Sequence, residues 1–308
     1  MANQIINRML KLKTRPMMGN VSSENFELVE EEVRDIEDGE ILIKNLFLSF
    51  DPTQRGWLND VPSYIPPVKI GEIMRASSVG RVIESKNENF SIDDIVQGSF
   101  GWQEYAISGD EKGFMPPRKL PEGITPTSAL SIYGVTGLTA YFGMIDIGKP
   151  EKNNTVLISG AAGATGSVAG QIARIKGATN VIGIAGGSDK CKWVVEEAGF
   201  DSCIDYKNED VAKRVTELAP KGLDIYFDNV GGSILEIALG NIAQKARVVM
   251  CGGISSGYTM ERLAPGPSTV FNLIIQRGRM EGFIVLDYAE QFPHAIMELA
   301  GWVAEGKI

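Results

Sequence analysis

The sequence is poor in the residues that bind metals or form disulfides. Its 308 residues include a single histidine, His294, and three cysteines, Cys191, Cys203 and Cys251. The cysteines are odd in number and have no Cys-x-x-Cys spacing, which favours free thiols in a reducing cytoplasm. A zinc site needs about four clustered Cys, His or carboxylate ligands. We therefore expect no bound metal.

Long apolar runs and excess positive charge are also missing. No apolar run approaches the ~18 residues of a membrane span, and the N-terminal MANQIINRMLKLKTRP lacks the apolar core of a signal peptide. The 30 Lys and Arg against 39 Asp and Glu give a net charge of −9, which argues against nucleic acid or an anionic membrane as the main partner. We expect a cytoplasmic protein with neither partner.

The pattern of the chain changes near residue 126. Before it, turn residues separate expected strands at 26–30, 40–50, 80–85, 95–100 and 103–107. After it, a helix expected at 128–145 is followed by alternating strands and helices, which imply a doubly wound parallel sheet. The sequence thus predicts an α/β protein of two domains, with a β-rich domain at 1–126 and a Rossmann-type domain at 127–308.

A glycine-rich turn stands at the start of this second pattern. The β-branched run 155–158 reads as a buried strand and leads into Gly160, Gly163 and Gly166, which a helical pattern follows. Strand, glycine turn and helix in that order form the context of a dinucleotide fingerprint, in which a pyrophosphate meets the helix N-terminus. Ala161 replaces the usual first glycine. The alternative is a glycine-rich turn without a nucleotide.

The end of the second strand indicates which dinucleotide would bind. An NAD-binding unit places Asp or Glu after this strand to hold the ribose 2′-hydroxyl. After 180–185 the chain instead has Gly186, Gly187 and Ser188, with Lys190 close behind. Without a carboxylate to repel a 2′-phosphate, and with a lysine able to pair with it, the sequence favours NADPH. Lys190 could also be a solvated lysine of a helix's first turn.

Several segments together resemble the medium-chain dehydrogenases and reductases. They narrow the resemblance to the zinc-independent branch of leukotriene B4 dehydrogenase/prostaglandin reductases, plant alkenal double-bond reductases and bacterial curcumin reductases. In chain order they are SFDP (49–52), RG (55–56), SYIPPV (63–68), GEIMR (71–75), YGVTGLTAY (133–141), DNVGG (228–232), CGGIS (251–255) and RMEGF (279–283). Thr53 stands where many relatives carry tyrosine, which leans toward the curcumin reductases. Relatives also continue beyond the position of Ile308, so the resemblance implies that a C-terminal return to the first domain is missing here.

The resemblance implies a fold, a reaction and a set of site residues. The fold is a Rossmann domain behind a GroES-like β-rich domain, and the reaction is metal-independent reduction of the conjugated C=C bond of an enal or enone by NADPH. The expected catalytic residues are Tyr258, as donor to the enolate oxygen, and Tyr64, as a lining residue. The expected cofactor-binding residues are Thr136, Ala162, Gly163, Ala164, Thr165, Gly166, Gly186, Lys190, Tyr206, Asn229, Cys251, Gly252 and Ile284.

Alternatives remain for each of these residues and for the function. Tyr258 could be an exposed loop aromatic, Tyr64 a packing residue, Asn229 a turn former and Tyr206 a surface aromatic, and Thr136 could be structural. The rival functions are a quinone reductase of the same superfamily and a non-catalytic NADPH-binding sensor or structural protein. In relatives the strand at 281–286 pairs with a second subunit, so we also expect a homodimer.

Overall fold

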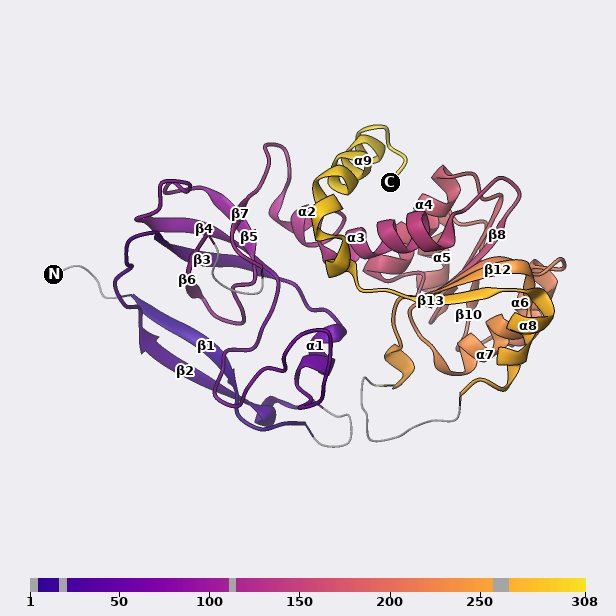
Figure 1. Cartoon of the computed structure of the whole chain (residues 1–308), viewed down its shortest axis with the longest axis horizontal. Helices are drawn as coiled ribbons and strands as arrows, with labels where there is room; N and C mark the ends of the chain where they lie inside the picture. The colour runs from indigo at the N-terminus through magenta and orange to yellow at the C-terminus, as the bar shows by residue number, and fades with distance from the viewer. Residues whose placement is uncertain (1–4, 17–20, 111–114, 257–265) are drawn as a thin grey trace. The chain divides into compact units, whose positions relative to one another are not determined.

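The computed structural model describes residues 5–16, 21–110, 115–256 and 266–308 (Figure 1). It divides into two compact units, which meet in the sequence between Leu130 and Ser131. The first holds the described part of the chain up to that point, and the second holds nearly all of the rest. Each unit has its own sheet and its own core.

The first unit is built on antiparallel strands. A five-stranded sheet has the order β6-β3-β4-β5-β7, and β1 and β2 form a separate hairpin. Ile41, Ile43, Val82, Val96 and Ala106 are fully or nearly fully buried and form the core of this sheet. The elements are β1 Ile6–Leu12, η1 Ser23–Asn25, β2 Phe26–Glu32, β3 Glu40–Leu48, α1 Thr53–Trp57, β4 Ser78–Ser85, β5 Ile95–Gly98, β6 Tyr105–Gly109, β7 Arg118–Lys119 and α2 Pro126–Leu130.

The second unit holds a six-stranded parallel sheet of order β10-β9-β8-β11-β12-β13. This is the doubly wound Rossmann order, in which the crevice for a dinucleotide opens between β8 and β11, at the carboxyl ends of the strands. The strands are β8 Thr155–Ser159, β9 Asn180–Ala185, β10 Ser202–Asp205, β11 Leu223–Asp228, β12 Ile242–Met250 and β13 Arg279–Gly282. The predicted fold class is confirmed.

Helices cover both faces of this sheet (Figure 1). They are α3 Val135–Phe142, the π-helix η2 Gly143–Gly148, α4 Ala164–Ile175, α5 Ser188–Glu196, α6 Val211–Leu218, α7 Gly232–Gly240, α8 Asn272–Gln276 and α9 Phe292–Ala304, with short 3₁₀ turns η3 Ile254–Ser256, η4 Ser268–Phe271 and η5 Val285–Gln291. One core lies between the sheet and α3, α4 and α9, and a second lies under α6 and α7.

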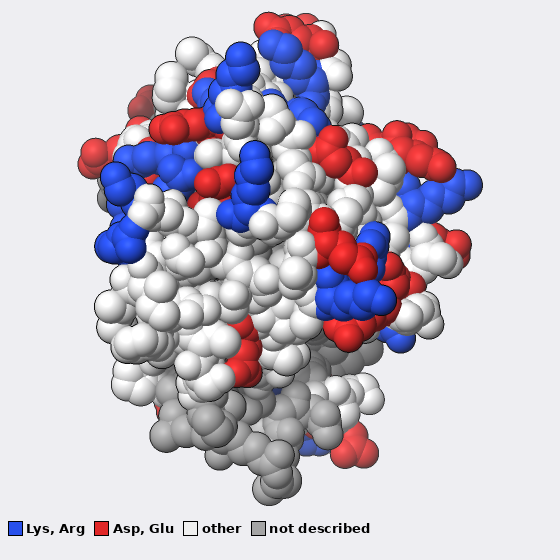
Figure 2. Space-filling view, turned by 90° about the vertical axis from the view of Figure 1, so that its right-hand side faces the viewer, with Lys and Arg blue, Asp and Glu red and all other residues white. Residues whose placement is uncertain are grey.

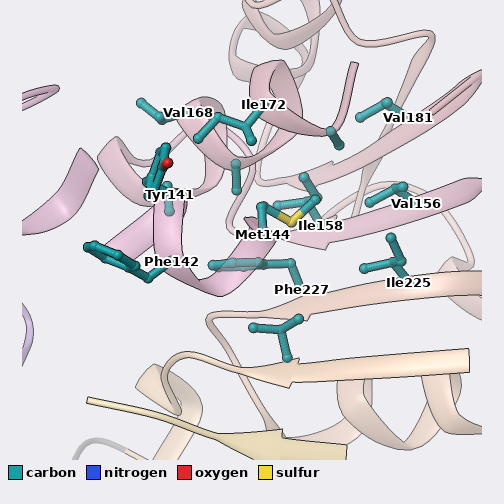
Figure 3. Close-up of a cluster of buried hydrophobic side chains, with 14 of the residues drawn as sticks. Tyr141, Phe142, Met144, Val156, Ile158, Val168, Ile172, Val181, Ile225 and Phe227 are labelled. Carbon is teal, nitrogen blue, oxygen red and sulfur yellow. The ribbon is translucent and has the colours of Figure 1, made fainter. Parts of the chain in front are cut away.

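Figure 3 shows the first of these two cores at close range. Side chains of β8 and β11, among them Val156, Ile158 and Phe227, form this cluster together with Val168 and Ile172 of α4. All but Val168 of these five are completely buried. Burial of apolar side chains on this scale stabilises each by about 1.5–3 kcal/mol, so the glycine turn between β8 and α4 is held by a rigid base.

Two predicted elements were wrong in detail. The helix expected at 128–145 is interrupted by a turn at 131–134, because Gly134 is extended and the Gly137 backbone approaches the Ile132 carbonyl oxygen. A Cβ on Gly137 would lie 1.9 Å from that oxygen. The strand expected at 281–286 instead ends at Gly282, and a 3₁₀ turn begins at Val285. Strand β1 was not predicted.

The surface shown in Figure 2 mixes Lys and Arg with Asp and Glu and includes a broad area without charge. No charge of one sign dominates that face. Within the described ranges, none of the helices combines the length and the apolar character needed to cross a bilayer.

Candidate cofactor-binding site

The glycine turn between β8 and α4 allows an unusually close approach of backbone to backbone. Gly160 leaves β8 with φ +63°, a conformation that favours glycine. A Cβ added to Gly166 would lie 2.3 Å from the Gly160 carbonyl oxygen, so any larger residue would push the helix away. Gly163 precedes α4 and offers no side-chain cap. The first N–H groups of α4 thus stay available to an anion, as a bound pyrophosphate requires.

The expected residues Ala162, Ala164 and Thr165 lie in the same turn. Ala164 and Gly163 are exposed, Ala162 and Thr165 are half-buried, and Gly166 is buried. The structure therefore brings the predicted phosphate-binding backbone together at one edge of the sheet.

A second group of predicted residues meets at the end of β9. We call Gly186, Lys190 and Tyr206 the lysine edge. A Cβ on Gly186 would lie 2.8 Å from the Tyr206 ring, so the ring lies directly against this glycine. The Tyr206 N–H donates to the Ala185 carbonyl (3.1 Å), yet 51% of the residue is exposed. Lys190 is exposed in the first turn of α5, and no ion pair to it occurs among the described residues.

An acidic residue that we did not predict lies beside the lysine edge. Asp205 ends β10 and is 6% exposed. Its Oδ1 accepts the N–H groups of Gly187 (2.8 Å) and Lys207 (3.1 Å), and its Oδ2 accepts Nδ2 of Asn208 (2.7 Å). These hydrogen bonds, Asn208 and Gly187 foremost, lower the pKa of Asp205. The inference that this edge lacks a carboxylate was therefore incomplete, because the neighbouring strand supplies one whose oxygens are engaged by the loop.

The end of β11 carries a fully buried carboxylate. Asp228 is 0% exposed, and its Oδ1 accepts hydrogen bonds from the Tyr226 hydroxyl (2.7 Å), Ser159 Oγ (3.0 Å), and the N–H groups of Val230 (2.9 Å) and Gly231 (2.8 Å). Its Oδ2 has no partner among the described residues. Burial, and then the Asp228 charge, raise the pKa of Tyr226 well above its usual value. Four donors on one oxygen fix this loop.

Three predicted cofactor residues are hydrogen-bonded to Ser159 or to the main chain of Asp228. The Asn229 N–H donates to Ser159 Oγ (2.9 Å) and its Nδ2 donates to the Ser159 carbonyl (2.7 Å). The N–H groups of Cys251 and Gly252 both donate to the Asp228 carbonyl, each at 2.9 Å. We call Ser159, Tyr226, Asp228 and Asn229 the strand-end network. Asn229 therefore lies at the end of β11, but its amide nitrogen already donates a hydrogen bond to the Ser159 carbonyl.

The two remaining predicted residues of the second unit, Thr136 and Ile284, make hydrogen bonds within the protein. Thr136 is half-buried in the first turn of α3, and its hydroxyl donates to the Ser131 carbonyl (3.1 Å). Ile284 precedes η5, and its carbonyl accepts the Asp287 N–H (3.0 Å). A role for either residue toward the cofactor stays a prediction.

The two predicted tyrosines differ in what can be said of them. Tyr258 lies outside the described residues. Tyr64, in the first unit, is 45% exposed, and its hydroxyl accepts the Trp57 indole N–H (3.1 Å) and shares a short hydrogen bond with the Thr53 hydroxyl. Thr53, the residue at which the sequence departs from many relatives, is thus a hydrogen-bond partner of the Tyr64 hydroxyl.

Comparison with known proteins agrees with this geometry. Residues 8–116 match a family described as the N-terminal domain of oxidoreductase, and residues 164–301 match one described as zinc-binding dehydrogenase. The chain is 38% identical to the NADPH-dependent curcumin reductase of Escherichia coli over 98% of its own length and 87% of that protein's. It is 37% identical to bovine prostaglandin reductase 1, covering 94% and 86% of the two chains. The chain belongs to the medium-chain dehydrogenase/reductase family, in the curcumin and prostaglandin reductase branch.

Solved structures place this member of the family in the same branch. The NADPH complex of CurA from Vibrio vulnificus superposes with a TM-score of 0.89 at 38% identity, covering 98% of this chain and 89% of that one. The NADPH complex of Escherichia coli quinone oxidoreductase has a TM-score of 0.73 at 20% identity, covering 98% and 89%, which is a likeness of fold alone.

One of the matched descriptions mentions zinc. Across residues 5–16, 21–110, 115–256 and 266–308, no group of three or more His, Cys, Asp or Glu side chains could hold a metal ion. Two cysteines do approach each other, with Sγ of Cys203 donating to Sγ of Cys191 at 3.1 Å. Sequence reasoning missed this pair, because the two residues are twelve positions apart on different elements.

Proposed function

We propose that this protein uses NADPH to reduce the conjugated C=C bond of α,β-unsaturated aldehydes or ketones. The observation that carries the proposal is 38% identity with a curcumin reductase over 98% of the chain. At the coarser level, membership of this branch makes the protein an NADP-dependent oxidoreductase. The glycine turn and the lysine edge supply the residues for the cofactor, and the enal or enone substrate is the finer part of the proposal.

The residues present fit NADPH. The pyrophosphate would lie on the N–H groups at the start of α4, a helix that Gly166 lets pack close to the Gly160 backbone. At the lysine edge, Lys190 would pair with the 2′-phosphate and the Tyr206 ring would contact the adenosine. When bound, NADPH supplies the hydride that adds to the β-carbon of the substrate.

The chain's own contribution to the reaction is to stabilise negative charge on the substrate oxygen. As the β-carbon gains a hydride, charge builds up on the carbonyl oxygen, and a positioned hydroxyl lowers the barrier. We assign this role to Tyr258, which follows the CGGIS segment (251–255) that the strand-end network holds in place. The Cys251 and Gly252 amides are fixed on Asp228, so the segment leading to Tyr258 starts from a rigid point.

Tyr64 is assigned to lining the substrate. Its oxygen already accepts a hydrogen bond from Trp57 and shares another with Thr53. A hydroxyl with these two partners is less free to donate a proton to a substrate, while its 45% exposure leaves the ring available for contact. This supports a binding role over a proton-donor role.

An assay panel tests the proposal against both rivals. NADPH oxidation would be followed with a short 2-alkenal, an enone, a curcumin-like diarylenone, a quinone and no substrate. Turnover with the conjugated carbonyls, and little with the quinone, is the expected result. Turnover with the quinone alone would favour the quinone reductase, and tight NADPH binding without turnover of any compound would favour a non-catalytic protein.

A homodimer is the second part of the proposal. Strand β13 is the edge of its sheet, and all four of its residues are exposed, which leaves a row of backbone groups for another chain. Pairing of two such edges would join two sheets across a two-fold axis. Light scattering coupled to size-exclusion chromatography should give twice the mass of the chain, and a monomer at all concentrations would refute this part.

A further inference from the structure

Two thiols meet beside the lysine edge. Cys191 lies in α5, directly after Lys190, and Cys203 lies in β10, two residues before Asp205. Their sulfur atoms are 3.1 Å apart, and neither cysteine is in a disulfide. Both are half-buried at the edge of the core under α4. The proposed function gives neither of them a role.

The two thiols are held on unequal supports. Cys203 is fixed by its strand, which pairs with β9 in a parallel register that aligns Cys203 with Gly183. Cys191 lies in the first turn of a nine-residue helix, and besides the Cys203 sulfur its Sγ makes a long contact with the Ala185 carbonyl (3.9 Å). Burial, and then the neighbouring Cys191, raise the pKa of Cys203 above its usual range. If the sulfurs move closer, the helix turn is therefore the part that shifts.

We propose that Cys191 and Cys203 form an oxidisable dithiol, which a hydroperoxide converts to a disulfide that weakens NADPH binding. The inference about NADPH rests on the proposed function, whereas the dithiol itself does not. Disulfides inside cells are mostly transient or redox-sensing, and a pair of adjacent thiols meets that description better than a lone cysteine.

The chemistry needs only the peroxide as oxidant. The Cys191 sulfur, as thiolate, attacks one peroxide oxygen and becomes a sulfenic acid, while the other oxygen leaves as water or an alcohol after taking a proton. The Cys203 sulfur then attacks the Cys191 sulfur, and the hydroxide that leaves takes up the Cys203 proton as water. Two thiols and one hydroperoxide thus give one disulfide, one water and one water or alcohol.

Bond formation would act on Lys190 through the helix. The S–S distance of a disulfide is about 2.0 Å, so the sulfurs must approach by roughly an ångström from 3.1 Å. With β10 fixed, the first turn of α5 moves and displaces Lys190 from the ribose 2′-phosphate. NADH has no 2′-phosphate, so its affinity should hardly change.

The first experiment tests the dithiol without reference to cofactor. The protein is treated with hydrogen peroxide under native conditions, then denatured and analysed by thiol counting and peptide mass spectrometry. The free thiols should fall from three to one, with a peptide pair joining Cys191 and Cys203. Cys251 should remain free, because no other sulfur atom contacts it among the described residues. Sulfinic acids on single cysteines without a joined pair would overturn the proposal.

The second experiment compares cofactor binding by reduced and oxidised protein, using Cys191→Ser and Cys203→Ser as matched controls. In the wild type, oxidation should raise the Kd for NADPH and leave the Kd for NADH unchanged. The largest expected increase is that for the loss of one charge-assisted contact, about 10- to 150-fold. Neither serine variant should respond to peroxide. A joined pair with unchanged NADPH affinity refutes the regulatory effect. Reduced protein that binds no NADPH refutes the proposed function instead.

Discussion

The strand-end network and the lysine edge lie at the same end of one sheet but use their polar groups in opposite ways. In the network, the Asp228 Oδ1 accepts four hydrogen bonds, and the residue has no exposed surface. At the lysine edge, Lys190 is exposed and Tyr206 presents half of its surface to solvent. Polar groups bonded within the protein, such as the Asp228 Oδ1, therefore build the crevice, whereas side chains left open to solvent are available to a ligand.

The largest effect on stability should follow from removing the Asp228 carboxylate from the strand-end network. Asp228→Ala leaves the N–H groups of half-buried Val230 and buried Gly231, and two hydroxyls, without this acceptor. Each unsatisfied buried group costs about 1–3 kcal/mol, and with partial relaxation we expect a loss of about 3–5 kcal/mol in the free energy of unfolding. Denaturant unfolding would measure this loss.

Asp189→Ala is the control for that experiment. Asp189 is exposed on α5, and no hydrogen bond or ion pair to it occurs among the described residues. Its removal should change the unfolding free energy by less than about 0.5 kcal/mol. Equal stability of the two variants would mean that the network does not hold the loop.

The next effect concerns Tyr258, which follows the segment 251–255 in the sequence. Tyr258→Phe removes the hydroxyl proposed to stabilise the enolate and should lower kcat by about 10²–10³-fold, with NADPH affinity nearly unchanged. Tyr64→Phe should act mainly on KM, because uniform binding is lost without loss of transition-state stabilisation. Steady-state kinetics with an enone would measure both. A full kcat in Tyr258→Phe with none in Tyr64→Phe would reverse the two roles.

Much of the second unit could be predicted from its sequence because local pattern and global fold agree there. The runs at 180–185 and 223–228, which were expected to be strands, became β9 and β11 with the expected bounds. Gly166 was expected in the turn between strand and helix, and a Cβ there would lie 2.3 Å from the Gly160 carbonyl oxygen. The spacing of residues along the chain was sufficient in these cases.

Contacts between distant residues could not be predicted in the same way. Asp205 reaches Gly187 from the next strand, and Cys203 reaches Cys191 across twelve positions, so neither contact leaves a mark in local periodicity. The break at 131–134 depends on the approach of Gly137 to Ile132, which a helical pattern hides. The strand-end motif DNVGG pointed to Asn229, yet it is Asp228, one position earlier, that holds the loop.

A smaller effect tests the lysine edge, whose side chains are open to solvent. Lys190→Ala should weaken NADPH binding much more than NADH binding, since one lost charge-assisted contact is worth about 1.5–3 kcal/mol, or about 10- to 150-fold. Lys192→Ala is the matched control, because Lys192 is on the same helix but pairs with Glu196 (3.8 Å). Fluorescence titration with both cofactors would measure the affinities. A wild type that binds NADH and NADPH equally would refute the role of Lys190.

The smallest effect lies beside the lysine edge, at Asp205. Its pKa is lowered by hydrogen bonds from Asn208 and Gly187, so its ionised form is favoured in the folded state. A carboxylate of this kind adds stability that is fully present above its unfolded pKa of about 3.9 and is lost as pH falls through its lower folded pKa. Asp205→Asn should therefore flatten the loss of stability in acid below about pH 4. Thermal unfolding measured across that range would show this flattening.

Asp189→Asn is the control, because Asp189 is an exposed carboxylate without a described partner. It should keep the wild-type dependence of stability on pH. An unchanged dependence of stability on pH in Asp205→Asn would mean that Asp205 only fills the space beneath Gly187. Its charge would then not stabilise the lysine edge.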